Sequence, residues 1–285
     1  MKRMAWLCCT IGVGGLSAVT GCGSSGGPDG GPLQPMGRII EYVGDGGGSL
    51  KPWPAFLPPK PADDALALGG LLNPGAAATE SSVPRKQTNW FRLPSRSTST
   101  TMIVTLQPTA NEDSDLFLLE ASSYSDGVFV LGYSNRTPDG GALDPAGGFA
   151  PDWVPLTAGP TGGYPAANVA VLGTATGATP KHFRIEMDIP VPLAVGGPSV
   201  TTTVAQYQSR WYSYGSPGGP YTITVTPETG DPDFYAYLQN AATYLGGQIG
   251  PGGGSMQGEA YSPAPRYIRV YGFTNTKYTI QITAP

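Results

Sequence analysis

The sequence predicts an all-β protein built from two tandem antiparallel β-sandwiches. The chain contains 42 Gly and 30 Pro in 285 residues, and only 13% of its residues are charged. Gly and Pro disfavour helices, whereas the plentiful Thr, Val, Tyr and Ile suit half-buried strands. Short runs of these strand formers are separated by Gly/Pro turns, as in β-sandwiches. The order of the runs occurs twice, which indicates a duplication.

Residues 1–21 are expected to form an export signal. The basic residues near Met1 precede an apolar run that is too short and too rich in Gly to span a bilayer as a helix. The run ends in Val19-Thr20-Gly21-Cys22, which resembles the lipobox of bacterial lipoproteins. That resemblance implies that Cys22 is lipidated and holds the protein on a membrane of the bacterial cell envelope, and Gly23 implies the outer membrane. The alternative is ordinary secretory cleavage beside an incidental cysteine.

Residues 22–61 are expected to form a Gly/Pro-rich tether. Only the segment 38–43 within it has a strand-like composition, and we expect it to dock on a sandwich edge. Cys8 and Cys9 lie in the export signal, so Cys22 is the single cysteine of the expected mature chain and disulfides are excluded. The net charge of −4, without a basic patch, argues against nucleic-acid binding.

Residues 62–190 and 191–285 are the two expected sandwiches. They open with similar segments, 65–70 and 192–197. Each then has a strand with Trp, a Thr-rich strand, an Asp-x-Asp turn entering an apolar strand, and a closing hairpin of two strands. In the first repeat these segments are 89–93, 102–108, 113–119, 168–173 and 183–187, and in the second they are 210–214, 221–227, 231–238, 267–272 and 278–282. The Thr-rich strands alternate with period two, which predicts one buried and one wet face for each.

This order of elements resembles the bacterial pre-peptidase C-terminal (PPC) domain, here in tandem over most of the mature chain. The resemblance implies a jelly-roll-like β-sandwich that serves as an accessory or binding module, sometimes with calcium, and that binds collagen in some collagenases. The family often has an Asp directly before the Trp, whereas this chain has Asn89 and Arg210. That departure weakens any transfer of a metal-linked or capping role to these two positions.

The first repeat is longer because of a Gly/Pro-rich stretch. This stretch, residues 138–165, is expected to be a long loop, and such loops are often functional or disordered.

The Asp-x-Asp turns are the candidate metal ligands. They offer the carboxylates of Asp113, Asp115, Asp231 and Asp233, and clustered oxygen ligands suit calcium. The alternative is that these side chains bond to nearby backbone N–H groups and fix the turns.

Tyrosines of the second repeat are the candidate ligand-binding residues. Strand alternation places Tyr235 and Tyr237 on one face of their strand, and places Tyr267, Arg269 and Tyr271 on one face of another. Tyrosine offers apolar area and a hydroxyl, which suits recognition of a polysaccharide or a fibrous protein. The alternative is that this face packs between sheets or against the other repeat. The equivalent positions in the first repeat are expected to be Phe117, Leu119, Asn168, Ala170 and Leu172.

The sequence gives no positive sign of catalysis. His182 is the single histidine, so it would have to serve any Ser–His–acid triad, and a zinc site lacks ligands. We expect His182 to be an exposed strand residue. The sequence therefore predicts a non-catalytic surface module without a resident cofactor, calcium apart. The alternative is an envelope hydrolase with a carboxylate pair, whose separation in space a sequence does not reveal.

Overall fold

The described part of the chain comprises separate stretches of a computed structural model. They are residues 40–43, 70–84, 88–95, 100–109, 114–120, 127–134, 151–156, 167–173, 181–215, 220–238, 244–248, 252–258 and 266–284. Cys22, Asp113, the export signal, most of the tether and most of the segment 138–165 lie outside these residues. The predictions made for them are therefore still predictions.

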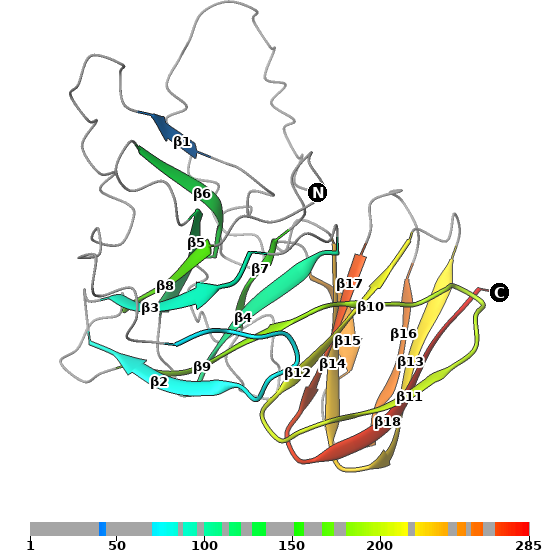
Figure 1. The fold of residues 1–285 in the computed structure, drawn as a ribbon. Helices are drawn as coiled ribbons and strands as arrows, with labels where there is room; N and C mark the ends of the chain where they lie inside the picture. The colour runs from blue at the N-terminus through cyan, green and yellow to red at the C-terminus, as the bar shows by residue number, and fades with distance from the viewer. Residues whose placement is uncertain are drawn as a thin grey trace, which may run out of the picture.

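The described residues form eighteen strands and no helix (Figure 1). No helix in this part of the chain is therefore long and apolar enough to cross a membrane. The strands up to the middle of the chain are β1 (Ile40–Val43), β2 (Thr79–Val83), β3 (Thr88–Leu93), β4 (Met102–Pro108), β5 (Ser114–Glu120), β6 (Gly127–Ser134), β7 (Asp152–Leu156), β8 (Ala167–Gly173) and β9 (Lys181–Asp188). The remaining strands are β10 (Val191–Pro192), β11 (Val200–Val204), β12 (Ser209–Tyr214), β13 (Tyr221–Thr229), β14 (Pro232–Leu238), β15 (Tyr244–Gln248), β16 (Gly254–Gly258), β17 (Arg266–Gly272) and β18 (Thr276–Thr283).

These strands make four sheets. Sheet 1 has the order β1-β6-β5-β8-β3, sheet 2 β2-β9-β4-β7, sheet 3 β10-β12-β17-β14-β15, and sheet 4 β11-β18-β13-β16. Pairing is antiparallel throughout the named strands except between β10 and β12. Consecutive strands from β2 to β9 alternate between sheets 1 and 2 except at the β5–β6 pair, and β11 to β18 repeat this pattern. Eight strands so connected are typical of a jelly-roll-like sandwich. The prediction of an all-β protein is confirmed.

Each pair of sheets encloses its own apolar core. One core joins inward side chains of sheets 1 and 2, and the other joins those of sheets 3 and 4. The same two positions bridge the layers in both copies. Phe91 and Phe183 meet edge to face at 6.2 Å in the first sandwich, while the hydroxyls of Tyr212 and Tyr278 hydrogen bond at 2.7 Å in the second.

The register of the strands confirms the duplication and corrects where the first copy opens. Trp90 and Phe117 both pair with Ala170, as Trp211 and Tyr235 both pair with Arg269. The opening segments match through Leu72 and Leu193, whose N–H groups donate to Arg92 and Ser213 at 2.9 and 2.8 Å. The predicted match of 65–70 with 192–197 is therefore wrong by several residues. That match relied on the Gly-Gly pair at the end of both segments, whereas backbone hydrogen bonds define the equivalent positions.

Two further expectations about elements need correction. The two strands that close each repeat do not pair with one another: β8 and β17 lie in sheets 1 and 3, while β9 and β18 lie in sheets 2 and 4. The expected loop 138–165 contains β7, which pairs with β4. By contrast, β1 does dock on a sheet edge as expected, beside β6.

The predicted alternation holds for one Thr-rich strand and fails for the other. In β13 the buried side chains of Tyr221, Ile223 and Val225 alternate with more exposed threonines. In β4 every residue is buried. The reason is that β4 has the first core on one face and the second sandwich on the other, as the contacts below show.

Candidate functional site

The tyrosine face predicted to bind a ligand is buried between the two sandwiches. Its strands β14 and β17 are neighbours in sheet 3. However, the five side chains have exposed fractions of only 0 to 7%. They are Tyr235, Tyr237, Tyr267, Arg269 and Tyr271. The prediction of a solvent-exposed recognition strip is therefore wrong, and the alternative of packing against the other repeat is confirmed.

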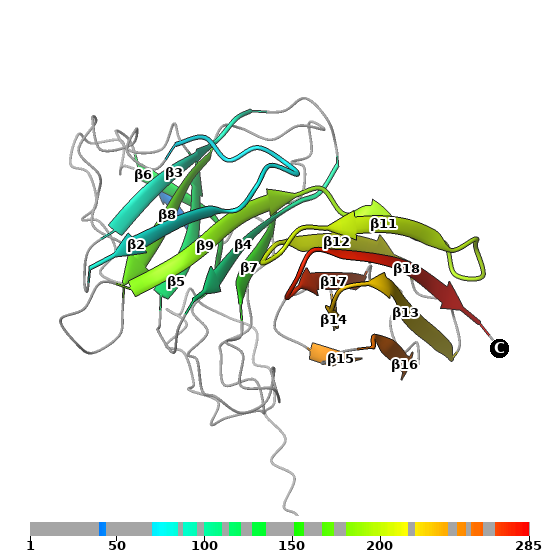
Figure 2. The ribbon, with the colours of Figure 1, turned by 90° about the horizontal axis from the view of Figure 1, so that it is seen from below.

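The covering surface is the outer face of sheet 2. Trp153 of β7 lies with its ring centroid 4.8 Å from that of Trp211, 5.1 Å from Tyr237 and 5.9 Å from Tyr267. The Trp211 indole N–H donates to Thr105 Oγ1 of β4 at 3.0 Å. Figure 2 shows β4, β7 and β9 on the side of the first sandwich that faces the second. An aromatic cluster thus joins sheets 2 and 3, which makes four layers in all.

Arg269 is the polar centre of this junction. It is 1% exposed, and its Nε and Nη2 donate to Ser209 Oγ and to Gln107 Oε1, each at 2.7 Å. Its guanidinium also lies 4.7 Å from the ring centroid of Tyr271. A buried cation is costly unless it is hydrogen-bonded and compensated. Gln107 of the first sandwich therefore accepts a hydrogen bond from a buried guanidinium of the second.

Glu186 and Asp188 of β9 cap the free edge of β12. Strand β10 pairs only with Tyr212 and Ser213, so it leaves the rest of that edge open. The N–H of Ser209 donates to both carboxylate oxygens of Glu186 at 2.9 and 3.0 Å, and the N–H of Trp211 donates to Asp188 Oδ2 at 3.0 Å.

An uncapped edge of this kind would leave buried amides unpaired. Asp188 Oδ1 also accepts from Arg210 Nη1 at 3.0 Å and from the N–H of Ile189 at 2.9 Å.

Burial raises the pKa of both carboxyls above their usual range. For Glu186 the loss of hydration outweighs its bonds to Ser209 and the attraction of Arg269, which act in the opposite direction. For Asp188 the loss of hydration outweighs the bonds from Trp211 and Ile189 and the attraction of Arg210. These acids are engaged by backbone amides inside the junction, so they serve its architecture.

The Asp-x-Asp turn of the second sandwich is held by threonine hydroxyls. The N–H of Asp231 donates to Thr274 Oγ1 at 3.0 Å and to Thr276 Oγ1 at 3.1 Å. Asp233 is buried, and its Oδ2 accepts from the Tyr235 hydroxyl at 3.4 Å. Asp115 is half-buried at the equivalent position of the first sandwich. The described residues contain no group of three or more His, Cys, Asp or Glu able to hold a metal ion, and calcium binding stays a prediction.

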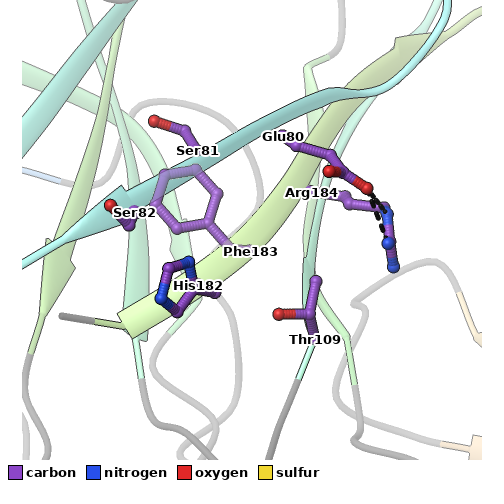
Figure 3. Close-up of a pocket in the computed structure, with 7 residues that line it drawn as sticks. All are labelled: Glu80, Ser81, Ser82, Thr109, His182, Phe183 and Arg184. Atoms are coloured by element: carbon purple, nitrogen blue, oxygen red, sulfur yellow. Dashed lines mark hydrogen bonds and ion pairs between the residues drawn. The ribbon is translucent and has the colours of Figure 1, made fainter. Parts of the chain in front are cut away.

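A shallow hollow lies at the edge of sheet 2, over β2 and β9 (Figure 3). It has a volume of about 420 Å³ and is lined by Glu80, Ser81, Ser82, Thr109, His182, Phe183 and Arg184. Arg184 Nη2 and Nε contact Glu80 Oε1 at 2.6 and 2.7 Å. His182 is exposed, as expected, and pairs in register with Ser82. This hollow is a polar, solvent-open feature outside the junction.

Comparison with known proteins assigns no family. No protein family model matches the chain, and no curated protein is significantly similar to it. Among solved structures, the PBSX exported protein XepA aligns over 73% of this chain and 86% of its own, with 8% identity and a TM-score of 0.26.

A protein from Eubacterium rectale, described as secreted, aligns over 68% of each chain with 12% identity and a TM-score of 0.22. TM-scores this low do not assign a fold family or a function to the chain. The likeness to PPC domains stays a prediction.

The junction residues that sequence reasoning missed include Trp153, Glu186, Asp188 and Gln107. A weak signal existed for Trp153, since Trp-Val-Pro-Leu is a strand-like run among glycines and prolines. Nothing in the sequence indicated that Glu186, Asp188 and Gln107 are buried, because charged or amide side chains at alternate positions are typical of a solvent-exposed strand face.

Proposed function

We propose that the chain is a lipoprotein of the bacterial cell envelope that acts at the surface as a non-catalytic structural or binding module. The observation that supports this best is the junction between the sandwiches, which buries aromatic and charged side chains from both. Independent domains usually meet through small, polar contacts and move relative to one another. This junction instead favours a rigid two-sandwich body, which suits a surface spacer or a platform for binding.

The lipid anchor of this proposal rests on the sequence preceding Cys22. Cys22→Ala is expected to move the protein from the membrane fraction to the soluble envelope or medium, as detected by immunoblotting of cell fractions. In intact cells, added protease is expected to degrade the wild-type protein, since the body faces outward. Membrane retention of the variant, or protection from protease in intact cells with cleavage after lysis, would contradict the proposal.

A carboxylate-based hydrolase is the alternative. Such an enzyme needs two carboxyl groups on opposite sides of an accessible bond. Glu186 and Asp188 are buried and bonded to backbone amides, and Glu80 is paired with Arg184. These arrangements support the non-catalytic proposal.

A further inference from the structure

The hollow at the edge of sheet 2 has the chemistry of a saccharide site. Its charged side chains, Glu80 and Arg184, compensate one another, so it has no net attraction for an anion or a cation. The hollow is nevertheless rich in hydrogen-bond donors and acceptors. They are the Glu80 carboxylate, the His182 imidazole, and the hydroxyls of Ser82 and Thr109. Its volume of about 420 Å³ falls within the usual range of ligand sites, about 300–1,000 Å³. An uncharged ligand rich in hydroxyls matches this inventory.

Tyr207 of the second sandwich adds an aromatic ring beside the hollow. The Arg184 guanidinium lies 4.3 Å from its ring centroid, while 37% of the residue stays exposed. Its backbone has φ of 60°, a left-handed conformation that costs a bulky residue energy. The short β11–β12 turn holds it there, and its N–H donates to the Gly272 carbonyl at 2.6 Å. Strain of this kind, at an exposed aromatic residue, points to a functional position.

The second sandwich carries different side chains on the equivalent surface. Register places Thr201, Thr203, Lys277 and Thr279 where the first sandwich has Glu80, Ser82, His182 and Arg184. Thr201 and Thr279 bond to each other at 3.1 Å, and Lys277 is paired with Glu228. This set of polar side chains therefore belongs to the first copy, beside Tyr207 of the second. The chain thus supplies a matched control.

We propose that this hollow binds a neutral polysaccharide. One sugar unit contacts the Glu80–Arg184 pair, Ser82 and His182, and the Tyr207 ring flanks it, since aromatic rings offer apolar area to sugar rings. The proposal rests on the binding role put forward above and names its site and ligand class.

The test is native affinity electrophoresis of the purified mature chain in gels that contain laminarin, dextran or xylan, with the anionic polymer alginate as a comparison. We expect retardation by at least one neutral polymer. The double variant His182→Ala/Ser82→Ala should weaken this binding by about tenfold, the effect of losing two neutral hydrogen bonds. The control Thr203→Ala/Lys277→Ala, at the equivalent positions of the second sandwich, should bind like the wild type.

Thermal unfolding of each variant shows whether it is folded. If the melting temperature of the His182→Ala/Ser82→Ala variant falls no further than that of the control, its loss of binding is due to the altered hollow. Retardation by none of the neutral polymers, by alginate alone, or equally in both double variants would overturn the proposal. Failure here leaves the anchored structural module intact, whereas the Cys22→Ala and protease experiments test that module and do not depend on the hollow.

Discussion

Sheets 2 and 4 are the same sheet in the two copies, yet their outer faces differ in almost every side chain. The outer face of sheet 4 carries hydroxyl and amide side chains that are half-buried or exposed. These are Thr222, Thr224, Thr226, Ser255, Gln281 and Thr283. The matching positions of sheet 2 are buried against the second sandwich. They are Ile103, Thr105, Gln107, Trp153, Glu186 and Asp188.

This difference shows how a duplication can create an interface without changing the fold. The inner faces keep their apolar character in both copies, and the register of the strands is retained. Sheet 3 also differs from its counterpart, sheet 1, since Arg269 occupies the position that Ala170 has in sheet 1. The predictions below test whether the outer-face side chains account for the junction.

Separating the copies is the largest change. Residues 191–285 contain a core of their own, so this segment alone is expected to unfold cooperatively. The isolated sandwich would expose Trp211 and four tyrosines of the junction, and a large exposed apolar patch promotes association. We therefore expect a lower melting temperature than that of the full chain and concentration-dependent self-association, measured by calorimetry and size-exclusion chromatography. A monomer with no loss of stability would show that the junction contributes little.

Exchanging one aromatic residue is a smaller change. Trp153→Ser gives the first copy the residue that the second has at Ser255. Removing a buried Trp costs about 3–5 kcal/mol by comparison with truncations to Ala in other cores, so urea unfolding should show a loss of this order. The reciprocal Ser255→Trp alters an exposed site and should stay within about 0.5 kcal/mol of the wild type. Similar effects of the two exchanges would contradict the assigned difference between the faces.

The smallest expected effect is on the pH dependence of stability. The folded protein raises the pKa of Glu186 above its ordinary value of 4.5, so the folded state binds this proton more tightly than the unfolded chain does. This contribution to stability is therefore complete below pH 4.5 and is lost as the pH rises through the folded pKa. Other carboxyls add their own slopes, so the wild type is compared with Glu186→Gln.

Glutamine has the size of Glu186, keeps one oxygen that can accept from the Ser209 N–H, and does not titrate. Subtracting the urea-unfolding free energies of the variant from those of the wild type should leave a difference that favours the wild type more as the pH falls from 7 to 5. A difference that is constant with pH would mean that the pKa of Glu186 is the same in the folded and unfolded chain.

The parts of the structure that could be predicted are those that depend on local pattern. Alternation correctly placed Tyr221, Ile223 and Val225 in a core, and the spacing from the Asp-x-Asp turns correctly matched Phe117 with Tyr235. Alternation also placed Tyr235 and Tyr237 on one face correctly. It says which side chains share a face but not what covers that face, so the burial of the tyrosines could not be derived.

The candidate site was beyond prediction for a related reason. Glu80 and Arg184 are separated by 104 residues, and Tyr207 comes from the other sandwich. Only the jelly-roll pairing of β2 with β9 and the packing of the two copies bring them together. None of these residues forms a sequence motif with its neighbours.

The carboxylate cap on β12 has a consequence for aggregation. If the sandwiches come apart, the amides of Ser209 and Trp211 lose their acceptors on β9 at the same moment as the aromatic face meets water. The opened molecule would then offer both an unpaired strand edge and apolar surface, the two features that promote strand pairing between chains. A species with both cores still folded is therefore expected to be the one that aggregates, and the rate of aggregation would follow the opening of the junction and not the unfolding of either core.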